Sequence, residues 1–254
     1  DILIPGIMEH IERAGIHSGD SISVYPAQSL TDGAKAKIAE YTRRLAKSLH
    51  VIGMINIQFI VCGEEDVYVI EVNPRSSRTV PYISKVTGVP MVDLATRVMT
   101  GTAIKDLGFG TGLCKTPPYY AVKVPVFSFE KLTDANSYLG PEMKSTGEVL
   151  GIGRTLNEAL FKGLTAAVLA LAAPTPGKET GVLLSVEEHD RTEVLALAEK
   201  LEMLGMRLYA TPDTAAAIGS LGKDVTVVPS IAEGDGVPAL LDSGKIGYII
   251  EIDP

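Results

Sequence analysis

The chain has 254 residues, of which 46% are hydrophobic and 21% charged, so it can bury the core of one large or two medium domains. Its formal net charge of −8 argues against non-specific nucleic-acid binding as its main activity. The two cysteines, Cys62 and Cys114, lack the spacing of metal ligands, and no segment has the character of a signal peptide or a membrane span. We therefore expect a protein of the reducing cytoplasm.

Residues 6–20 include a turn with two glycines, a histidine and a serine, which predicts a loop whose backbone can approach a ligand closely. The alternative is a purely structural loop. Residues 31–50 predict an amphipathic helix that packs in the core. Its apolar stripe consists of Ile38, Tyr41, Leu45 and Leu49.

Two alternating runs, residues 54–61 and 67–75, flank a polar loop at residues 63–66 and predict an antiparallel hairpin. With a four-residue loop, Gln58 lies opposite Glu71 and Asn56 opposite Asn73, and opposed side chains have Cβ atoms about 4.5–5.5 Å apart. The other face of this hairpin is predicted to carry Ile55, Ile57, Phe59, Tyr68, Ile70 and Val72.

The polar face of the hairpin combines one carboxylate with amide oxygens. Such a set suits a hard cation like Mg²⁺, which usually keeps waters and relies on bound phosphates. Arg75 and Arg78 follow directly, and their guanidinium groups could hold phosphate oxygens. The alternative is the solvent-facing polar side of an ordinary sheet.

The next segments are predicted from their breakers and caps. Val89-Pro90 begins a helix that runs to residue 101, residues 108–118 form a loop, and nearby prolines mark residues 119–129 as an edge strand. Thr155 and Glu158 form a capping box ahead of a helix that ends near Ala173. Residues 174–180 are the strongest linker candidate in the chain.

After the linker, strands and helices alternate. Strands are predicted at residues 181–186, 207–210, 225–228 and 247–252, and helices at 191–204, from 211 and at 238–241, with Asp190 as a cap and Gly205 as a stop. This order predicts a parallel sheet with helices on both faces and a ligand site at the carboxyl ends of the strands. Thr211 and Thr214 at a helix start suit a phosphate, and simple N-capping is the alternative.

Two sequence runs resemble a known family. Residues 71–79, Glu-Val-Asn-Pro-Arg-Ser-Ser-Arg-Thr, with residues 84–90, Ser-Lys-Val-Thr-Gly-Val-Pro, closely resemble the ATP-grasp core of the carbamoyl phosphate synthetase large chain. Residues 139–151 are similar to the same family. The Glu-x-Asn-Pro-Arg piece alone occurs across several ATP-grasp ligases, whereas the longer run is more specific.

The resemblance implies a fold of mixed α/β and α+β class. Residues 1–176 would be the C-terminal portion of an ATP-grasp domain with its connecting region. Residues 181–254 would be a Rossmann-like domain of the methylglyoxal-synthase type, truncated at its C-terminus. The chain begins at Asp1 and stops inside a strand-like run, so we expect a part of a longer protein.

The implied activity is ATP-dependent phosphorylation of carbamate to carbamoyl phosphate, for arginine and pyrimidine biosynthesis. Bicarbonate and ATP are the implied substrates, a glutamine amidotransferase small subunit the implied partner, and the full-length protein an oligomer. Gln58, Glu71 and Asn73 would hold Mg²⁺ or Mn²⁺ against the ATP phosphates, and Gln58 and Glu71 also count as nucleotide contacts. Arg75 and Arg78 would orient carbamate or neutralise the moving phosphoryl group.

The same resemblance implies further ligand contacts. Gly15, Ile16, His17 and Ser18 would contact the ribose and base region of ATP, and Glu12 and Asp20 fall where some members contact the activator ornithine. Val124 stands where ornithine-responsive relatives carry Glu, which makes that activation doubtful.

In the regulatory domain, Arg191, Thr211 and Thr214 would cradle a nucleotide phosphate. Ser230 replaces an expected Lys and Glu251 an expected Asn. A carboxylate near a phosphate is electrostatically unfavourable. We therefore predict weak or absent binding of a nucleotide effector.

Two alternatives remain. One is a different ATP-grasp ligase, such as a carboxylase or an amino-acid ligase, against which the long match over residues 74–90 and the second α/β domain argue. The other is a non-catalytic regulatory or assembly module. We expect the isolated chain to be inactive, because the upstream ATP-grasp lobe is absent from it.

Overall fold

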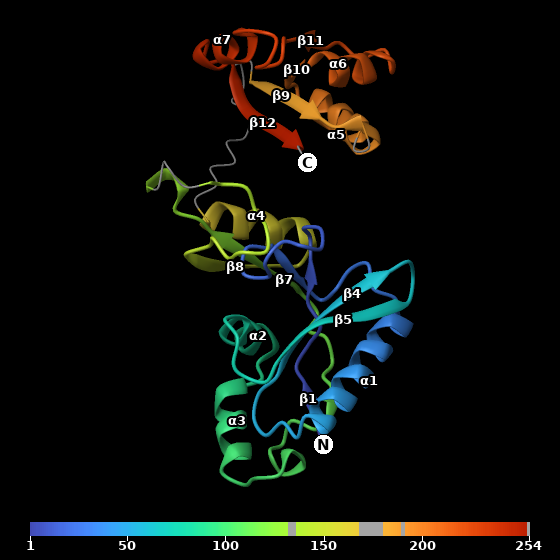
Figure 1. Cartoon of the computed structure of the whole chain (residues 1–254), viewed down its shortest axis with the longest axis vertical. Coiled ribbons are helices and arrows are strands. Elements are labelled where there is room, and N and C mark those ends of the chain that lie inside the picture. The colour runs from blue at the N-terminus through green and yellow to red at the C-terminus, as the bar shows by residue number, and fades with distance from the viewer. Residues whose placement is uncertain (132–135, 168–179, 189–190, 253–254) are drawn as a thin grey trace. The chain divides into compact units, whose positions relative to one another are not determined.

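The computed structural model describes residues 1–131, 136–167, 180–188 and 191–252 (Figure 1). It divides into two compact units, residues 1–170 and 171–254, which are described separately. The predicted linker lies outside the described residues except for Thr180, as does the predicted cap Asp190. The helix that begins after Thr155 ends at Ala166, so its predicted end near Ala173 is wrong. The domain division at residues 176 and 181 therefore stays a prediction. In the described ranges, no helix is both long and apolar enough to cross a membrane.

The first unit is built on an antiparallel sheet in the order β2-β3-β7-β8. The strands are β2 (Glu9–His10), β3 (Ser23–Tyr25), β7 (Tyr120–Val126) and β8 (Gly147–Gly153). Helix α4 (Leu156–Ala166) covers one face, where Val122 and Val124 are buried with Ala159. Helix α2 (Thr79–Thr87) covers the other, where Ala121 is buried with Tyr82.

The prediction that residues 119–129 form an edge strand is wrong. Strand β7 is central, because it pairs with β3 through residues 121–123 and with β8 along its whole length. Pro125 is tolerated since it lies opposite Glu148 of β8 but beyond the last residue that pairs with β3. Because no residue of β3 pairs with Pro125, the missing N–H of the proline costs no hydrogen bond on that side.

The hairpin is present as β4 (Asn56–Cys62) and β5 (Asp66–Asn73), and its predicted register at the polar patch is confirmed. Gln58 pairs with Glu71 and Asn56 with Asn73. The register then shifts at a bulge between Gln58 and Phe59, so that Phe59 pairs with Val69. The predicted four-residue loop is wrong, because Asp66 pairs with Cys62 and leaves only residues 63–65 in the turn.

The bulge changes which β5 side chains share the apolar face. Tyr68 lies opposite Ile60 rather than Val61, so its side chain is not on the same face of the hairpin as that of Phe59, contrary to the prediction. Ile70 is the extra residue of the bulge and is 54% exposed. The predicted apolar face holds for residues 57, 59 and 72, which keep their alternation on either side of the shift.

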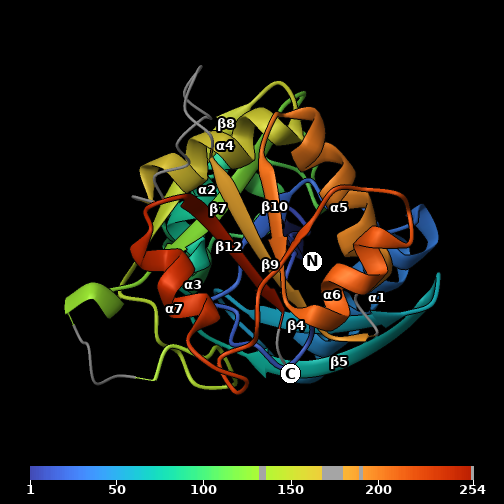
Figure 2. The same ribbon diagram turned by 90° about the horizontal axis from the view of Figure 1, so that it is seen from above.

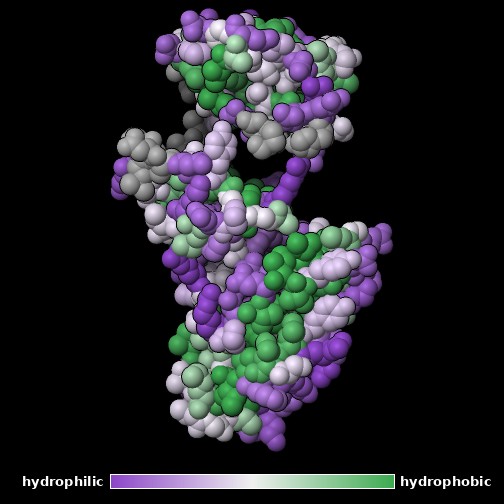
Figure 3. Space-filling model, viewed as in Figure 1, coloured by the Kyte–Doolittle hydropathy of each residue, from purple (hydrophilic) through white to green (hydrophobic). Residues whose placement is uncertain are grey.

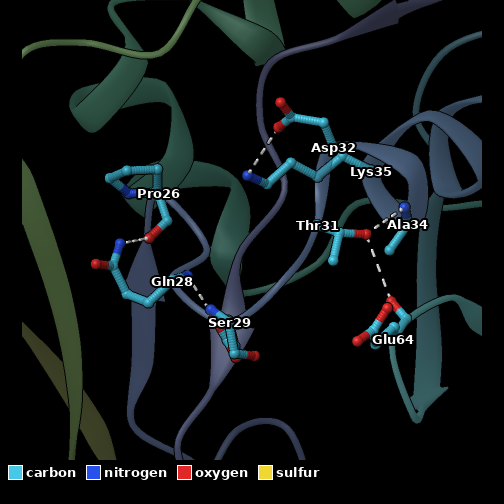
Figure 4. A network of polar contacts seen from close by, with 9 residues as sticks. Pro26, Gln28, Ser29, Thr31, Asp32, Ala34, Lys35 and Glu64 are labelled. Atoms are coloured by element: carbon cyan, nitrogen blue, oxygen red, sulfur yellow. Dashed lines mark hydrogen bonds and ion pairs between the residues drawn. The ribbon is translucent and has the colours of Figure 1, made fainter.

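Helix α1 (Asp32–Ser48) follows the predicted range closely, and Thr31 is its N-cap. The Thr31 hydroxyl accepts from the Ala34 N–H at 3.0 Å and donates to the Glu64 carbonyl at 3.4 Å, which ties the helix start to the hairpin turn (Figure 4). Ile38 is buried as predicted, but Leu49 is 52% exposed because the helix has ended before it.

Helix α2 was not predicted from the pattern, since it is short and rich in β-branched residues. Pro81 lies in its first turn, where a proline removes no helical hydrogen bond, and Gly88 ends it with φ +71°. Helix α3 (Met91–Met99) is preceded by Pro90 at the N-cap, close to the prediction. Two short strands, β1 (Leu3–Ile4) and β6 (Gly112–Leu113), pair in parallel.

The second unit confirms the predicted parallel sheet, in the order β11-β10-β9-β12. Its strands are β9 (Gly181–Val186), β10 (Arg207–Ala210), β11 (Thr226–Val227) and β12 (Ile246–Ile252), and its helices α5 (Arg191–Met203), α6 (Pro212–Gly219) and α7 (Gly236–Asp242). Helices α5 and α6 cover one face and α7 the other (Figure 2). The strand order reverses between β9 and β12, which is where open sheets of this kind bind ligands.

Candidate functional site

The loop of residues 15–20 in the first unit is held in one shape by local hydrogen bonds. Gly15 has φ +109°, a conformation that side chains rarely adopt. The imidazole Nδ1 of His17 accepts from the Gly19 N–H at 3.0 Å, and the His17 N–H donates to the Gly140 carbonyl at 2.8 Å. The His17 side chain thus shapes the loop as well as lying where a nucleoside contact is predicted.

The two carboxylates predicted to contact an effector are both engaged by backbone groups. Asp20 has no exposed surface, and its oxygens accept the N–H groups of Lys144 at 2.7 Å and Ser145 at 2.8 Å. Burial raises the pKa of Asp20, but the hydrogen bonds from Ser145 and Lys144 outweigh it and leave the pKa below its usual value. Glu12 accepts the Ile22 N–H at 2.7 Å, and burial raises its pKa. Their role toward an effector remains a prediction.

The structure brings the loop to the polar patch of the hairpin. The side-chain amide of Gln58 donates to the Ser18 hydroxyl at 3.2 Å and to the Glu71 carboxylate at 3.3 Å. The Asn73 amide donates to the other oxygen of Glu71. Ser18, Gln58, Glu71 and Asn73 therefore form one continuous polar cluster, although Ser18 is far from the others in sequence.

The donor set of this cluster fits a magnesium or manganese ion that is also coordinated by the phosphates of a nucleotide. It offers one carboxylate and two amides, which are oxygen ligands of the kind hard cations prefer. Within the described ranges, no group of three or more His, Cys, Asp or Glu side chains could hold a metal. A cation at the patch would thus depend on phosphate oxygens and water for its remaining ligands.

The two arginines lie past the end of β5 with different surroundings. Both are exposed, and the Arg75 guanidinium donates to the Ser76 carbonyl at 2.9 Å. Arg78 is the residue before the first turn of α2. Arg75 borders the large cavity of this unit, whereas Arg78 does not.

That cavity has a volume of about 520 Å³ and combines part of the predicted site with an apolar wall. The predicted residues that border it are Glu12, Gly15, Ile16, Ser18, Gln58 and Arg75. Ile55, Ile57 and Phe59 are among the apolar residues that line it. Figure 3 shows apolar side chains gathered over the hairpin and alongside α1. His17, Glu71, Asn73 and Arg78 do not border this cavity, so the structure brings together only part of the predicted set there.

Lys123 is a polar residue that the sequence analysis did not single out. It is 2% exposed in the middle of β7, and its ammonium group donates to the carbonyls of Ser18 at 3.0 Å and Gly19 at 3.4 Å. The available signal was a single lysine within an otherwise apolar strand. The next residue, Val124, is 1% exposed and packs against α4.

The second unit has its own pocket, of about 290 Å³, at the carboxyl ends of its strands. Thr211 borders it, whereas Thr214 is fully buried and its hydroxyl accepts the Val186 N–H at 3.0 Å. The Arg191 guanidinium pairs with Asp213 at 3.7 Å. Among the residues that the structure describes, four carboxylates line the pocket: Glu187, Asp213, Glu233 and Glu251.

Ser230 borders this pocket, and its hydrogen-bond donors are already bonded to one of those carboxylates. Glu233 accepts both the N–H and the hydroxyl of Ser230 at 2.9 Å, and these hydrogen bonds lower the pKa of Glu233. The donors that Ser230 could offer an anion are therefore used within the chain. The sequence analysis noted Ser230 and Glu251 but missed Glu233.

Comparison with known proteins gives a consistent set of relatives. Residues 2–107 match the family described as carbamoyl-phosphate synthase L chain, ATP binding domain. Over 252 residues, 99% of this chain, the sequence is 57% identical to the carbamoyl phosphate synthase large chain of Lachnoclostridium phytofermentans and 52% identical to that of Agathobacter rectalis. The chain spans 23% of the length of each of these relatives.

Similarity to solved structures is weaker. A single-chain, multi-domain long-chain acyl-CoA carboxylase matches 64% of this chain and 20% of its own chain, with a TM-score of 0.49 and 18% identity. The ADP complex of N5-carboxyaminoimidazole ribonucleotide synthetase matches 65% and 44%, with a TM-score of 0.46 and 16% identity.

Proposed function

We propose that this chain, which is similar to one segment of carbamoyl phosphate synthase large chains, works in such a subunit in the ATP-dependent phosphorylation of carbamate. The observation that carries the proposal is identity of 52–57% over 99% of the chain. A different ATP-grasp ligase is disfavoured by this identity. As in the sequence analysis, the pathway would be arginine or pyrimidine biosynthesis, with bicarbonate and ATP as substrates.

Phosphoryl transfer needs mainly positioning and neutralisation of charge. The cluster of Gln58, Glu71 and Asn73 would hold Mg²⁺ or Mn²⁺, and the ion would supply positive charge beside the ATP phosphates. Arg75 and Arg78 would orient carbamate and neutralise the moving phosphoryl group. Support for these roles comes from the confirmed register of the hairpin and from Arg75 bordering the same cavity as Gln58.

The nucleoside of ATP would lie against Gly15, Ile16, His17 and Ser18. The direct hydrogen bond between Gln58 and Ser18 supports this arrangement, because it places the loop beside the proposed metal ligands. Ammonia would come from a glutamine amidotransferase small subunit. The parallel-sheet unit would be the regulatory domain of methylglyoxal-synthase type, and the full-length subunit would be oligomeric.

The reverse half-reaction tests the proposal without the upstream steps. A full-length large chain that contains this segment is expected to form ATP from carbamoyl phosphate and Mg²⁺–ADP, measured with a luminescent ATP assay. The isolated segment should form none. Failure of the full-length chain, combined with ATP cleavage that depends on a carboxylate acceptor, would instead identify another ligase of the ATP-grasp class.

The second unit should bind a nucleotide phosphate weakly. Four carboxylates of the described residues line its pocket, and each lost or opposed charged hydrogen bond costs about 1–3 kcal/mol of binding. Ser230→Lys with Glu251→Asn should strengthen binding of uridine or inosine monophosphate to the full-length chain by roughly tenfold or more, measured by calorimetry. Ser230→Ala with Glu251→Asn is the control that adds no cation. Micromolar affinity for either nucleotide in the unmutated chain would contradict this reading of the pocket.

A further inference from the structure

Lys123 is buried at the centre of the sheet of the first unit. It pairs in register with Ser23 of β3 and with Leu150 of β8, and it is 2% exposed. Burial lowers the pKa of its ammonium group, while the nearby carboxylates of Glu148, Glu12 and Asp20 raise it. A buried ammonium group is costly unless its protons are accepted, so its partners identify what it stabilises.

Those partners are backbone carbonyls in the loop of residues 15–20, which is proposed to contact the nucleoside. The ammonium group donates to the Ser18 carbonyl at 3.0 Å and to the Gly19 carbonyl at 3.4 Å. The hydroxyl of Ser18 in turn accepts from Gln58, and Gln58 donates to Glu71. One chain of hydrogen bonds therefore runs from β7 through the loop to the proposed metal ligands on β4 and β5.

The loop has other supports that do not involve Lys123. The hydroxyl of Ser145 donates to the Gly19 carbonyl at 3.1 Å, and Asp20 accepts two backbone N–H groups. The Asp20 N–H donates to the His17 carbonyl at 2.8 Å. These bonds hold the shape of the loop, whereas Lys123 links it to the sheet beneath Ser18. Removing the ammonium group should thus displace Ser18 without unfolding the loop.

We propose that Lys123 is a positioning residue of the nucleotide site, which acts through Ser18 and Gln58 rather than by touching ATP. The proposal rests on the proposed function, because it assigns the cluster around Gln58 to Mg²⁺–nucleotide binding. A displacement of about 1 Å in a site of this kind can cost up to roughly 10²-fold in rate. This positioning role also explains why a lysine interrupts the otherwise apolar strand β7.

The test uses Lys123→Met in the full-length chain, since methionine keeps an unbranched apolar stem of similar size. We expect ATP synthesis from carbamoyl phosphate to fall by roughly 10–100-fold, with weaker binding of Mg²⁺–ATP measured by calorimetry. Lys123→Arg should restore part of both. Lys144→Met is the matched control, because the Lys144 ammonium group also donates to backbone carbonyls, those of Asn136 and Tyr138, but away from Gln58.

A double-mutant cycle separates positioning from a general structural role. If Lys123 acts through Ser18, Lys123→Met should weaken Mg²⁺–ATP binding much less in a Ser18→Ala background than in the wild type. Equal losses in both backgrounds, or binding unchanged by Lys123→Met, would overturn the proposal. Failure of the proposed function would show differently, as a wild type that makes no ATP from carbamoyl phosphate. The binding cycle would still decide the role of Lys123.

Discussion

Glu71→Gln in the full-length large chain is expected to lower carbamate phosphorylation by about 10²–10³-fold. Glu71 is the only carboxylate of the proposed metal cluster, and both of its oxygens accept side-chain amides of Gln58 and Asn73. Glutamine keeps the size of the side chain but removes the charge that would hold the cation. ATP formation from carbamoyl phosphate and Mg²⁺–ADP measures the effect.

The fold should survive this change, because Glu71 is exposed on a polar face. Asp66→Asn is the matched control, since it removes one negative charge from the other end of the same strand. The control should retain activity, and both variants should melt near the wild-type temperature. Turnover close to normal in Glu71→Gln, or an equal loss in Asp66→Asn, would rule out Glu71 as the metal ligand.

Gly151→Ala should destabilise the first unit strongly, by about 3 kcal/mol, the upper end of the usual cost of overpacking. A Cβ atom at Gly151 would lie 2.0 Å from the Ala159 carbonyl oxygen and 2.5 Å from the Gly163 nitrogen. Both are backbone atoms of α4, so a side-chain rotation cannot relieve the clash. The helix would have to move away from β8 and expose the cluster around Val122 and Val124.

Gly147→Ala in the same strand is the control, since its nearest neighbour, the Val126 Cβ, would lie at an ordinary 3.8 Å. Hydrogen exchange followed by mass spectrometry separates the two units, because peptides from β7 and β8 should lose protection while those from β9 and β10 should not. Equal protection of β7 and β8 in the two variants would show that α4 does not pack as closely as the structure indicates.

The sequence alone determined the features that depend on short-range periodicity. Alternation on two adjacent runs predicted the hairpin and the shared polar face of Gln58 and Glu71. Their predicted pairing is correct although the turn is one residue shorter than predicted, because the bulge between Gln58 and Phe59 offsets the difference. The regular alternation of strands and helices after residue 180 likewise predicted a parallel sheet, since strands joined by helical crossovers pair in parallel.

Only the tertiary structure decided the features that depend on distant partners. The neighbours of β7, and therefore its central place, come from segments on both sides of it in the chain that its own pattern does not encode. The contacts of Lys123 with Ser18, and of Ser18 with Gln58, join three segments that are far apart in sequence. A periodic pattern reports which face of an element is apolar, but it carries no information about which other element covers that face. The candidate site forms because the tertiary structure places β7, the loop of residues 15–20 and the hairpin next to one another.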